Sequence, residues 1–477
     1  MGSTFSGLNT ALTSLYAQRR GLDVSGQNIA NANTEGYTRQ RVTMQSQNAN
    51  LVPGVYATTS AIGNGVTVSS VDRLRNAALD QRSYTEHSNS AYHNARAGAY
   101  SQIEDVFAEP SDTALQARLA DMWDGWNKIT TNPDQLAGKS AVVEQATTVA
   151  STLNDAASSL NNQYKAARTG LDTYVEDVNK AADAVAKLNS QIVIATQAGL
   201  QPNELQDQRA QQLLKLSELA GASATELPNG SINVFVGSAP LVSGFTTRAL
   251  EIEPGSANRL EDLATSEVNL RWADTKAAVS AGGSVGASME LLAKGGTLDS
   301  ITKRLDAVAK KLADSVNTAY SAGYATDGTT GEPFFVRTDT GTTTNVTAAQ
   351  IKVAVTDPAK LQISAGNPTG TPKVLDGNVA DEISDLADSR TDADAEYQSM
   401  IGELGVSAQA AIRRRDVQNA VTDQVDAARD AEAGVNLDEE MTNLLTYQRG
   451  YEAASRVLTT IDSMLDQLIN RTGMVGR

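Results

Sequence analysis

The sequence predicts a mainly α-helical protein with inserted β structure, an α+β fold drawn out into an elongated helical bundle or coiled coil built from both chain ends. Apolar residues recur every seventh position near both ends of the chain. A longer seam, from Leu153 to Ile192, alternates steps of three and four residues. Only 5% of the 477 residues are aromatic, which suits long helices with narrow seams better than a thick globular core.

Charge and composition argue against several classes of protein. The formal net charge of −17 disfavours nucleic acid as a partner. The chain contains no cysteine, which excludes disulfides, thiolate metal sites and cysteine nucleophiles. No apolar run reaches about 18 residues, so we expect no membrane span. The N-terminus also lacks the pattern of an ordinary secretory signal.

Residues 1–30 are expected to form an amphipathic helix, which belongs with residues 436–477 to one terminal coiled-coil domain. Two rows of apolar side chains define its seam, and the second row stops at Arg19. The seam residues are Phe5, Leu8, Leu12, Leu15, Leu22 and Ile29. The simpler alternative is an ordinary surface helix packed on its own domain.

Residues 31–70 lose the helical period and are expected to form a hinge with short strands. Asn28, Asn31 and Asn33 lead into it, and asparagine caps backbone groups and tolerates left-handed geometry. We expect Asn31, Asn33 and Gly36 to end the helix and turn the chain. Asn28 and Asn31, three residues apart on one helical face, are expected to bond to the backbone of a neighbouring subunit, although solvated loop residues would show the same pattern. Turns are expected at Pro53-Gly54 and at Gly63-Asn64-Gly65.

The long helical-bundle domain is expected to combine residues 71–223, 285–335 and 376–435. Its first helical stretch breaks near Glu109-Pro110, and Ser111 or Asp112 can cap the next helix. Core packing explains Trp123 and Trp126 on that helix better than a partner site does.

The seam that begins at Leu153 predicts a helix on the order of 60 Å long. A turn at residues 199–203 then sends the chain back as a helix from Glu204 to Leu219. Residues 224–284 are expected to be β-rich, because alternating and β-branched runs are separated there by glycines.

The second half of the chain mixes helices with one polar insertion. Gly282–Gly286 is expected to be a flexible connection to a helix from about Ala287 to Tyr320. Residues 336–375 predict a small polar insertion with "IKVAV" as its best strand candidate. Helix resumes near Asp381, with breaks expected near Gly402 and Gly434.

Residues 436–477 repeat the pattern of the first helix. Asn436 is the expected N-cap with Glu439 as its capping-box partner, and Arg471 and Gly473 mark the expected end. The residues of this stripe are Leu437, Met441, Leu444, Tyr451, Leu458, Ile461, Leu465 and Leu468. Neither terminal stripe has a partner beside it in the sequence, so we expect the two to pair with each other or with neighbouring copies.

Each terminal segment alone should be marginally stable. Six buried leucine-sized contacts contribute on the order of 10 kcal/mol. Ordering some twenty-five residues costs about 1–2 kcal/mol each, and helical hydrogen bonds recover only part of that cost. We therefore expect the termini to order mainly on assembly.

Catalytic and metal sites are not expected. His87 and His93 stand six residues apart and do not share a helical face as a metal pair would. Ser300 and Lys303 match a Ser-x-x-Lys pattern that is common by chance. Asp327–Glu332 has too few ligands for a calcium loop and predicts a turn. No cofactor is indicated.

Two long stretches carry a resemblance to a known family. "FSGLNTALTSLYAQRRGLDVSGQNIANANTEGYTRQRV" and "VNLDEEMTNLLTYQRGYEAASRVLTTIDSMLDQLIN" resemble the N- and C-terminal motifs of bacterial flagellar axial proteins, which form the rod, the hook and the hook-associated structures. Internal stretches such as "NELQDQRAQQLLKLSEL" resemble the hook-associated branch at the hook–filament junction. Two features depart from that pattern. Gly450 replaces the usual alanine, and residues 336–375 are shorter than the usual outer domain.

The resemblance implies a structural role rather than an enzymatic one. It implies a subunit exported unfolded through the flagellar channel and placed outside the cell at the hook–filament junction. Its terminal helices would surround the channel in a homo-oligomeric ring. The implied partners are the hook protein, the second junction protein and a cytoplasmic export chaperone that covers the C-terminal helix.

Alternatives from the same class and from other classes remain open at this stage. The chain could be another axial subunit, from the hook or the distal rod. It could instead be a secreted coiled-coil surface adhesin, although that class usually shows a signal peptide, an anchor or repeats. An enzyme is the least supported of the three.

Overall fold

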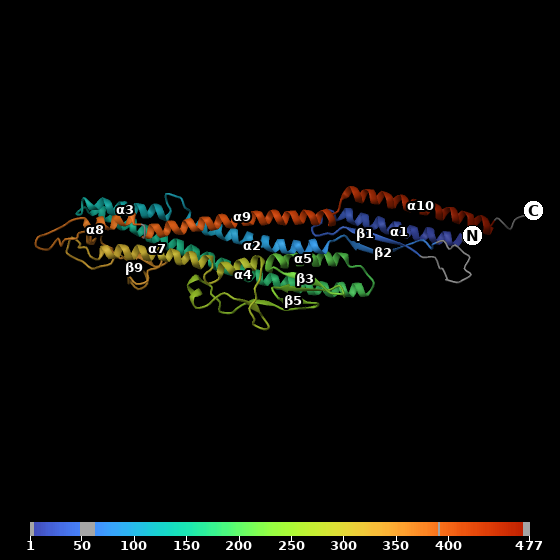
Figure 1. Cartoon of the computed structure of the whole chain (residues 1–477), viewed down its shortest axis with the longest axis horizontal. Coiled ribbons are helices and arrows are strands. Elements are labelled where there is room, and N and C mark those ends of the chain that lie inside the picture. Colours follow the sequence, from blue (N-terminus) through green and yellow to red (C-terminus); the bar gives the residue numbers. More distant parts are fainter. Residues whose placement is uncertain (1–3, 48–62, 390–391, 471–477) are drawn as a thin grey trace, which may run out of the picture.

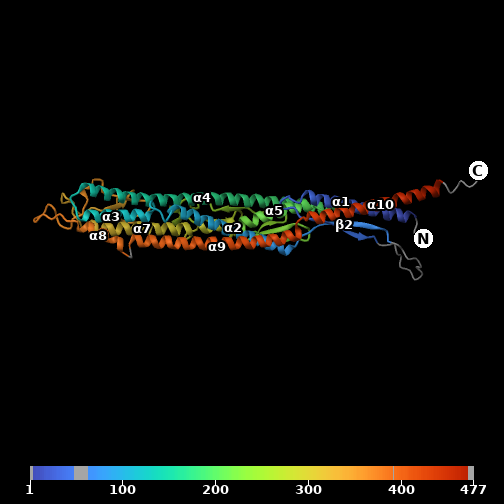
Figure 2. The same ribbon diagram turned by 90° about the horizontal axis from the view of Figure 1, so that it is seen from above.

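The computed structural model describes residues 4–47, 63–389 and 392–470 and shows one elongated molecule (Figure 1). Most helices run along its long axis, and the first and last helices lie together at one end (Figures 1 and 2). The mainly α-helical fold with inserted β structure is therefore confirmed. Pro53-Gly54, Arg471 and Gly473 lie outside the described residues.

The end that carries both termini is built from α1 (Thr4–Ala30), β1 (Gln40–Ser46), β2 (Val66–Arg73) and α10 (Leu437–Asn470), which we call the terminal unit. The two helices pack against each other along their length. The two strands form an antiparallel hairpin that packs on α1. A small apolar cluster of Val24, Val42 and Val71 holds this hairpin in place. Of the two pairings expected for the terminal stripes, pairing with each other is confirmed within one chain.

Small residues let α1 and α10 approach closely. A Cβ atom at Gly21 would lie 2.6 Å from the Tyr447 ring, so no larger residue fits there without a shift of that ring. A Cβ at Gly7 would lie 3.3 Å from Ile461. A Cβ at Gly450 would lie 2.7 Å from the Gln18 side chain. Gly450 therefore gives Gln18 room to lie against α10, which offsets part of the roughly 1 kcal/mol of helix propensity that glycine loses relative to alanine.

The rest of the chain is dominated by a bundle around α4 (Leu136–Gln197), whose 62 residues span about 93 Å. The seam predicted from Leu153 is buried along this helix, with Leu153, Leu160 and Leu171 fully covered. The other helices of the bundle are α2 (Ala77–Phe107), α3 (Leu115–Thr130), α5 (Asn203–Ala220), α6 (Gly283–Leu292), α7 (Thr297–Tyr320), α8 (Asn378–Ser384) and α9 (Ala393–Ala433).

The β structure lies against one side of the bundle. A four-stranded antiparallel sheet has the order β3 (Ser223–Glu226), β4 (Ile232–Val236), β5 (Ala239–Ser243) and β6 (Thr246–Thr247). Two short pairs accompany it: β7 (Leu250–Ile252) with β8 (Leu270–Trp272), and β9 (Phe335–Arg337) with β10 (Ile351–Val353). Asn189 of α4 anchors the sheet, because its Nδ2 donates to the Ile232 carbonyl at 2.9 Å.

The end of the bundle farthest from the termini has an aromatic core. The Trp126 ring packs edge-on against Tyr320 and Phe334, and its side chain is fully buried. Trp123 is also buried, and its indole Nε1 donates to Asp394 at 2.8 Å. The expectation that both tryptophans are core residues is confirmed.

Several local predictions were wrong. No break occurs at Gly402, because α9 runs continuously from Ala393 to Ala433. Gly282–Gly286 is not a flexible connection: α6 begins at Gly283, and a Cβ at Gly221 would lie 2.8 Å from the Gly282 Cα. Neither Ser111 nor Asp112 caps α3, since Ala114 takes the N-cap position without a side-chain bond.

The start of α10 confirms only part of the predicted capping box. The Asn436 Oδ1 accepts from the backbone N–H groups of Asp438 at 3.0 Å and Glu439 at 3.3 Å, so this N-cap is confirmed. The Glu439 carboxylate, however, accepts from Arg39 at 2.7 Å, a residue far away in the sequence. A non-local ion pair has therefore replaced the expected reciprocal cap.

Candidate assembly interface

The apolar residues predicted to form an assembly interface divide into two sets. The first set is half-buried within the α1–α10 pair: Leu8, Leu15, Leu22, Ile29, Leu444, Tyr451, Leu458, Ile461 and Leu465. The second set remains exposed in the single chain, with Leu12 at 38%, Leu437 at 50% and Met441 at 51%. The side chains of Phe5 and Leu468 lie outside the described residues.

Further exposed apolar side chains on the terminal unit were missed by the heptad pattern. They are Tyr16, Leu445, Val457, Met464 and Ile469, all at least half exposed. Leu437, Met441 and Leu445 follow one another at four-residue steps, so they lie within about 80° of arc on α10. We call this group the proximal flank. Val457 and Met464 lie on a different side of the helix, at roughly 100° per residue.

These exposed side chains are unusual for a monomeric surface. An isolated exposed leucine needs no explanation, whereas neighbouring exposed apolar residues on one helix indicate a partner. The signal that could have found Leu445 is its four-residue spacing from Met441. The heptad pattern did not include it, because the C-terminal sequence alone does not show which face of α10 is covered by α1.

The side chain of Asn28 makes its hydrogen bonds within the chain. Its Nδ2 donates to the Gln40 carbonyl at 2.8 Å and to Glu440 Oε2 at 3.1 Å, while its Oδ1 accepts from the Gln40 N–H at 3.0 Å and the Tyr37 hydroxyl at 2.8 Å. The residue is 1% exposed. All four hydrogen-bonding positions of the amide are filled, so it has nothing left to offer a neighbouring subunit.

The other two asparagines of the motif are arranged differently. Asn31 Nδ2 donates to the Gln27 carbonyl at 3.0 Å, and its Oδ1 accepts from Thr34 at 3.2 Å. Asn33 is exposed. Gly36, at φ +76°, completes the turn in a conformation that favours glycine. The segment therefore ends α1 as expected, and contact with a neighbouring subunit stays a prediction for Asn31 and Asn33.

A charged cluster surrounds Asn28. Arg39 Nε donates to Glu440 Oε1 at 2.8 Å, and Glu440 is only 2% exposed. The Arg39 N–H also donates to the Ala433 carbonyl at the end of α9, at 2.9 Å. Burial, with the nearby carboxylates of Asp207, Glu204 and Glu440, raises the pKa of Tyr37 to about 12, so its hydroxyl stays protonated and donates to Asn28. The cluster joins α1, β1 and α10 at one point.

His87 links three helices of the bundle near the terminal unit. Its Nδ1 lies 3.0 Å from Glu218 on α5, and its Nε2 lies 2.9 Å from Asp426 on α9. The bond to Glu218 raises the pKa of His87, with Asp426 acting in the same direction against the effect of burial. His93, by contrast, has a pKa that burial and the cations Arg414 and Arg96 lower.

We expect the His87 link to stabilise the bundle most at acidic pH. Because its folded pKa is raised, the stabilisation is full below the ordinary pKa near 6.5 and is lost as pH rises through the folded pKa. His87→Gln should cost about 1 kcal/mol in urea unfolding at pH 6 and little at pH 9, since both carboxylates are partly exposed. His93→Gln is the matched control and should show no such loss. An equal loss for His87→Gln at both pH values would contradict this prediction.

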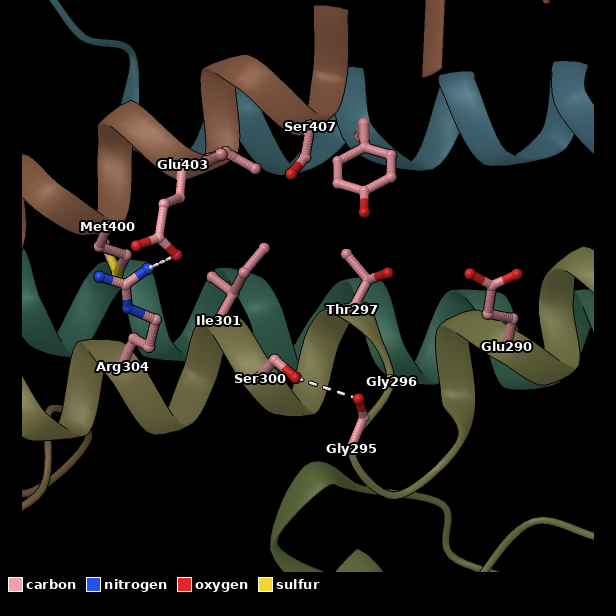
Figure 3. A pocket seen from close by; sticks show the side chains of 12 residues that line it. Glu290, Gly295, Gly296, Thr297, Ser300, Ile301, Arg304, Met400, Glu403 and Ser407 are labelled. Carbon is pink, nitrogen blue, oxygen red and sulfur yellow. Dashed lines mark hydrogen bonds and ion pairs between the residues drawn. The ribbon is translucent and has the colours of Figure 1, made fainter. Parts of the chain in front are cut away.

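Ser300 of the Ser-x-x-Lys pattern lines a cavity of the bundle. The cavity in Figure 3, about 310 Å³, lies between α2, the start of α7 and α9. Ser300 Oγ donates to the Gly295 carbonyl at 3.1 Å, and an ion pair joins Arg304 to Glu403 at its rim (Figure 3). Lys303 is bonded to Asp299 instead of Ser300. The Ser-x-x-Lys pair therefore does not form a nucleophile with its base.

Within residues 4–47, 63–389 and 392–470, no three His, Asp or Glu side chains lie together as a metal site would require. Over the same residues, no helix has both the length and the apolar character needed to span a bilayer. The exposed apolar side chains of the terminal unit, together with the polar cluster around Asn28, are the candidate functional site.

Three family models match this chain. Residues 100–335 match the helical domain of the flagellar hook-associated protein FlgK. Residues 8–38 match the flagella basal body rod protein family, and residues 431–471 match the C-terminal domain of the flagellar basal body rod FlgEFG proteins. The two rod-type matches fall on α1 and α10, and the helical-domain match falls on the bundle.

Two relatives that align with this chain along nearly their whole length have the same name. Flagellar hook-associated protein 1 of Bacillus subtilis is 30% identical over the whole of both chains. The protein of that name from Escherichia coli is 24% identical over 558 aligned positions, which cover 97% of this chain and 99% of the relative. A solved structure of the flagellar hook junction protein FlgK from Burkholderia pseudomallei superposes with a TM-score of 0.59 at 16% identity. It covers 74% of this chain and 100% of that one, and this likeness supports the fold.

Proposed function

The chain belongs to the flagellar hook-associated protein 1 family, and from this premise we propose that it is a structural subunit at the junction between the flagellar hook and the filament. The observation that carries this proposal is the full-length 30% identity to a relative of that name. The unpartnered apolar flanks of the terminal unit support it physically, because a subunit of an assembly must present surface that only its neighbours cover.

The terminal units are proposed to pack side by side around the export channel. The helical bundles would form the next layer outward, and neighbouring copies would close a homo-oligomeric ring. Apolar residues on two different sides of α10 suit a head-to-tail contact, in which each copy uses one side for each neighbour. A closed two-fold dimer would instead need one self-complementary patch.

Partners and location follow from the same premise. We propose contacts with the hook protein on one side of the ring and with the second junction protein on the other. Before assembly, the chain would leave the cell unfolded through the flagellar export apparatus. A cytoplasmic chaperone would cover α10, whose exposed Leu437, Met441 and Leu445 need shielding from non-specific contacts. No catalytic role is proposed.

An axial subunit of the hook or distal rod is the second candidate. It is favoured by the two rod-type matches at residues 8–38 and 431–471. Those matches cover only the ends of the chain, whereas the match at residues 100–335 carries the hook-associated name. An adhesin lacks any comparable support.

A deletion strain tests the proposed function directly. Cells that lack this protein should build hooks without filaments and release the filament protein into the medium. Expression of the intact chain from a plasmid should restore filaments. A strain that lacks hooks as well would support the rod or hook alternative, and a strain with normal filaments would refute both.

We also propose that the part of the terminal unit farthest from the bundle, residues 4–15 of α1 and 453–470 of α10, becomes rigid only beside neighbouring copies. Amide hydrogen exchange on dilute monomer should show protected bundle helices and less protected amides in these two stretches. Full protection of both terminal helices in the monomer would contradict this proposal.

A further inference from the structure

The terminal unit is tethered to the bundle from two sides. On one side, the chain passes from α9 into α10, and the Arg39 N–H bonds to the Ala433 carbonyl at 2.9 Å. On the other side, the start of α5 approaches the base of the hairpin formed by β1 and β2 (Figures 1 and 2). The chain also crosses from β2 into α2 through residues 74–76, so the contact from α5 adds a non-covalent link to two covalent ones.

The contact from α5 is made by three polar residues. Asn203, Asp207 and Gln211 are four residues apart, so they lie on one face of the helix. Asn203 and Asp207 are 7% and 6% exposed. Polar side chains this well covered normally have specific partners.

Each residue of this row bonds to the terminal unit or to the segments that lead into it. Asn203 Nδ2 donates to the Gln40 side chain at 3.0 Å and to the Val71 carbonyl at 2.9 Å, one partner on each strand. Gln211 Nε2 donates to the Glu35 carbonyl at 2.6 Å, in the turn after α1. A Cβ at Gly36 would lie 2.3 Å from Gln211, so glycine is needed there for this approach as well as for its φ.

Asp207 makes the most bonds. Its Oδ1 accepts from the Thr38 hydroxyl and from Arg73, both at 2.8 Å, and its Oδ2 accepts from the Thr38 N–H at 3.2 Å. The ion pair to Arg73 is largely covered, with 15% and 9% of the two side chains exposed. Burial lowers the pKa of Arg73, and the Asp207 carboxylate opposes that effect. Removal of either partner would leave a poorly solvated charge.

The local structure of α5 shows that these residues serve a distant contact. Asparagine and aspartate are strong N-cap residues, yet the N-cap position of α5 is Pro202, and no side chain caps this helix. Asn203 sits beside that position and bonds to the strands instead. The chain therefore forgoes local helix stabilisation in favour of a bond to the terminal unit.

We propose that Asn203, Asp207 and Gln211 form a clamp that fixes the direction of the terminal unit relative to the bundle. The inference rests on the proposed function in one respect: a tube of terminal units inside a layer of bundles can close only if every copy holds the same angle. The clamp itself is a property of the single chain and can be measured without assembly.

The chain has no native cysteine, so the two introduced cysteines are the only sites to which a thiol-reactive spin label can attach. A spin-label pair at Lys187→Cys on α4 and Glu452→Cys on α10 reports the angle between bundle and terminal unit by electron–electron double resonance. Position 452 lies about 22 Å along α10 from Leu437, so a swing of about 15° moves the label by about 6 Å. A second pair, Ala141→Cys with Lys187→Cys, lies within α4 and reports bundle integrity.

In dilute monomer, Asp207→Ala and Asn203→Ala should broaden or shift the distance between Lys187→Cys and Glu452→Cys by about 5 Å or more. The pair within α4 should not change. Gln208→Ala is the matched control, because Gln208 is exposed and adjacent to Asp207 on the same helix. If Asp207→Ala disrupts the bundle, Asn203→Ala and Thr38→Val decide the question, since neither removes a charged side chain. Unchanged distances in those variants would overturn the clamp.

Assembly provides the separate readout. A variant with an altered angle should form few filaments when it replaces the native chain in cells. An altered angle with normal filaments would refute the role of the clamp in assembly and leave the proposed junction function intact. Normal filaments in cells that lack the protein altogether would refute the proposed function and leave the clamp as a feature of the fold.

Discussion

Replacing Leu445 with aspartate should abolish filament attachment while the single chain stays folded. Leu445 is 50% exposed, and it belongs to the proximal flank with Leu437 and Met441. An exposed carboxylate costs the monomer little, because water solvates it. A neighbouring copy packed on this flank would bury the charge without a partner, at a cost of several kcal/mol. A loss of about 3 kcal/mol weakens each contact roughly 100-fold, and the contact recurs in every subunit of a ring.

The experiment compares Leu445→Asp with Thr446→Asp in cells that lack the native protein. Thr446 is exposed on the same helix and lies about 100–180° around its axis from the three residues of the proximal flank, so its variant should support near-normal filament numbers. Electron microscopy counts filaments on hooks, and circular dichroism of the purified chains checks that both variants fold. Filament numbers for Leu445→Asp equal to those of Thr446→Asp would show that the flank is not an interface.

Helical seams were predictable because their signal is local. Leu153 to Ile192 identified the core of α4 from spacing alone. The helix is nevertheless longer than predicted, because Val142, Ala146 and Val149 continue the same steps toward its start and are fully buried. Alanine in a seam carries little hydrophobic signal, although here it permits close helix packing.

Glycine misled the prediction where tertiary contacts decide. An isolated glycine costs a helix about 1 kcal/mol relative to alanine, which suggested a break at Gly402. Met400 and Leu404 on either side are 1% and 5% exposed, and burial of such side chains is worth roughly 1.5–3 kcal/mol each. Packing therefore outweighs local propensity, and α9 continues.

Polar sites were the least predictable, because their partners are far away in the sequence. Asn28 and Glu440 are 412 positions apart, and nothing in either local stretch indicates their bond. The row of Asn203, Asp207 and Gln211 is visible as a four-residue period, but the same period is typical of a solvated helix face. Only the position of the hairpin beside α5 distinguishes a clamp from a polar surface.

Asn28→Ala should loosen the base of the terminal unit more than any other asparagine substitution in the motif. The change removes four hydrogen bonds in a buried site: it leaves the Gln40 backbone without this partner and removes one donor from the Glu440 carboxylate, which keeps its bond to Arg39. Each buried group left unpaired costs about 1–3 kcal/mol, so we expect a local loss of about 3–5 kcal/mol. Amide exchange of β1 should then accelerate roughly 100-fold or more, unless its native protection is already smaller than that.

Two controls, the variant Asn33→Ala and the exchange of α4 peptides, show whether the effect is specific to Asn28 and to the terminal unit. Asn33 is exposed, so Asn33→Ala should leave the exchange of β1 unchanged. Peptides from α4 should exchange at the native rate in both variants, because the side-chain hydrogen bonds of Asn28 go to β1, to α10 and to the segment between α1 and β1. If Asn28→Ala and Asn33→Ala gave the same exchange in β1, the internal amide network would not hold this region, and an interface role for Asn28 would regain support.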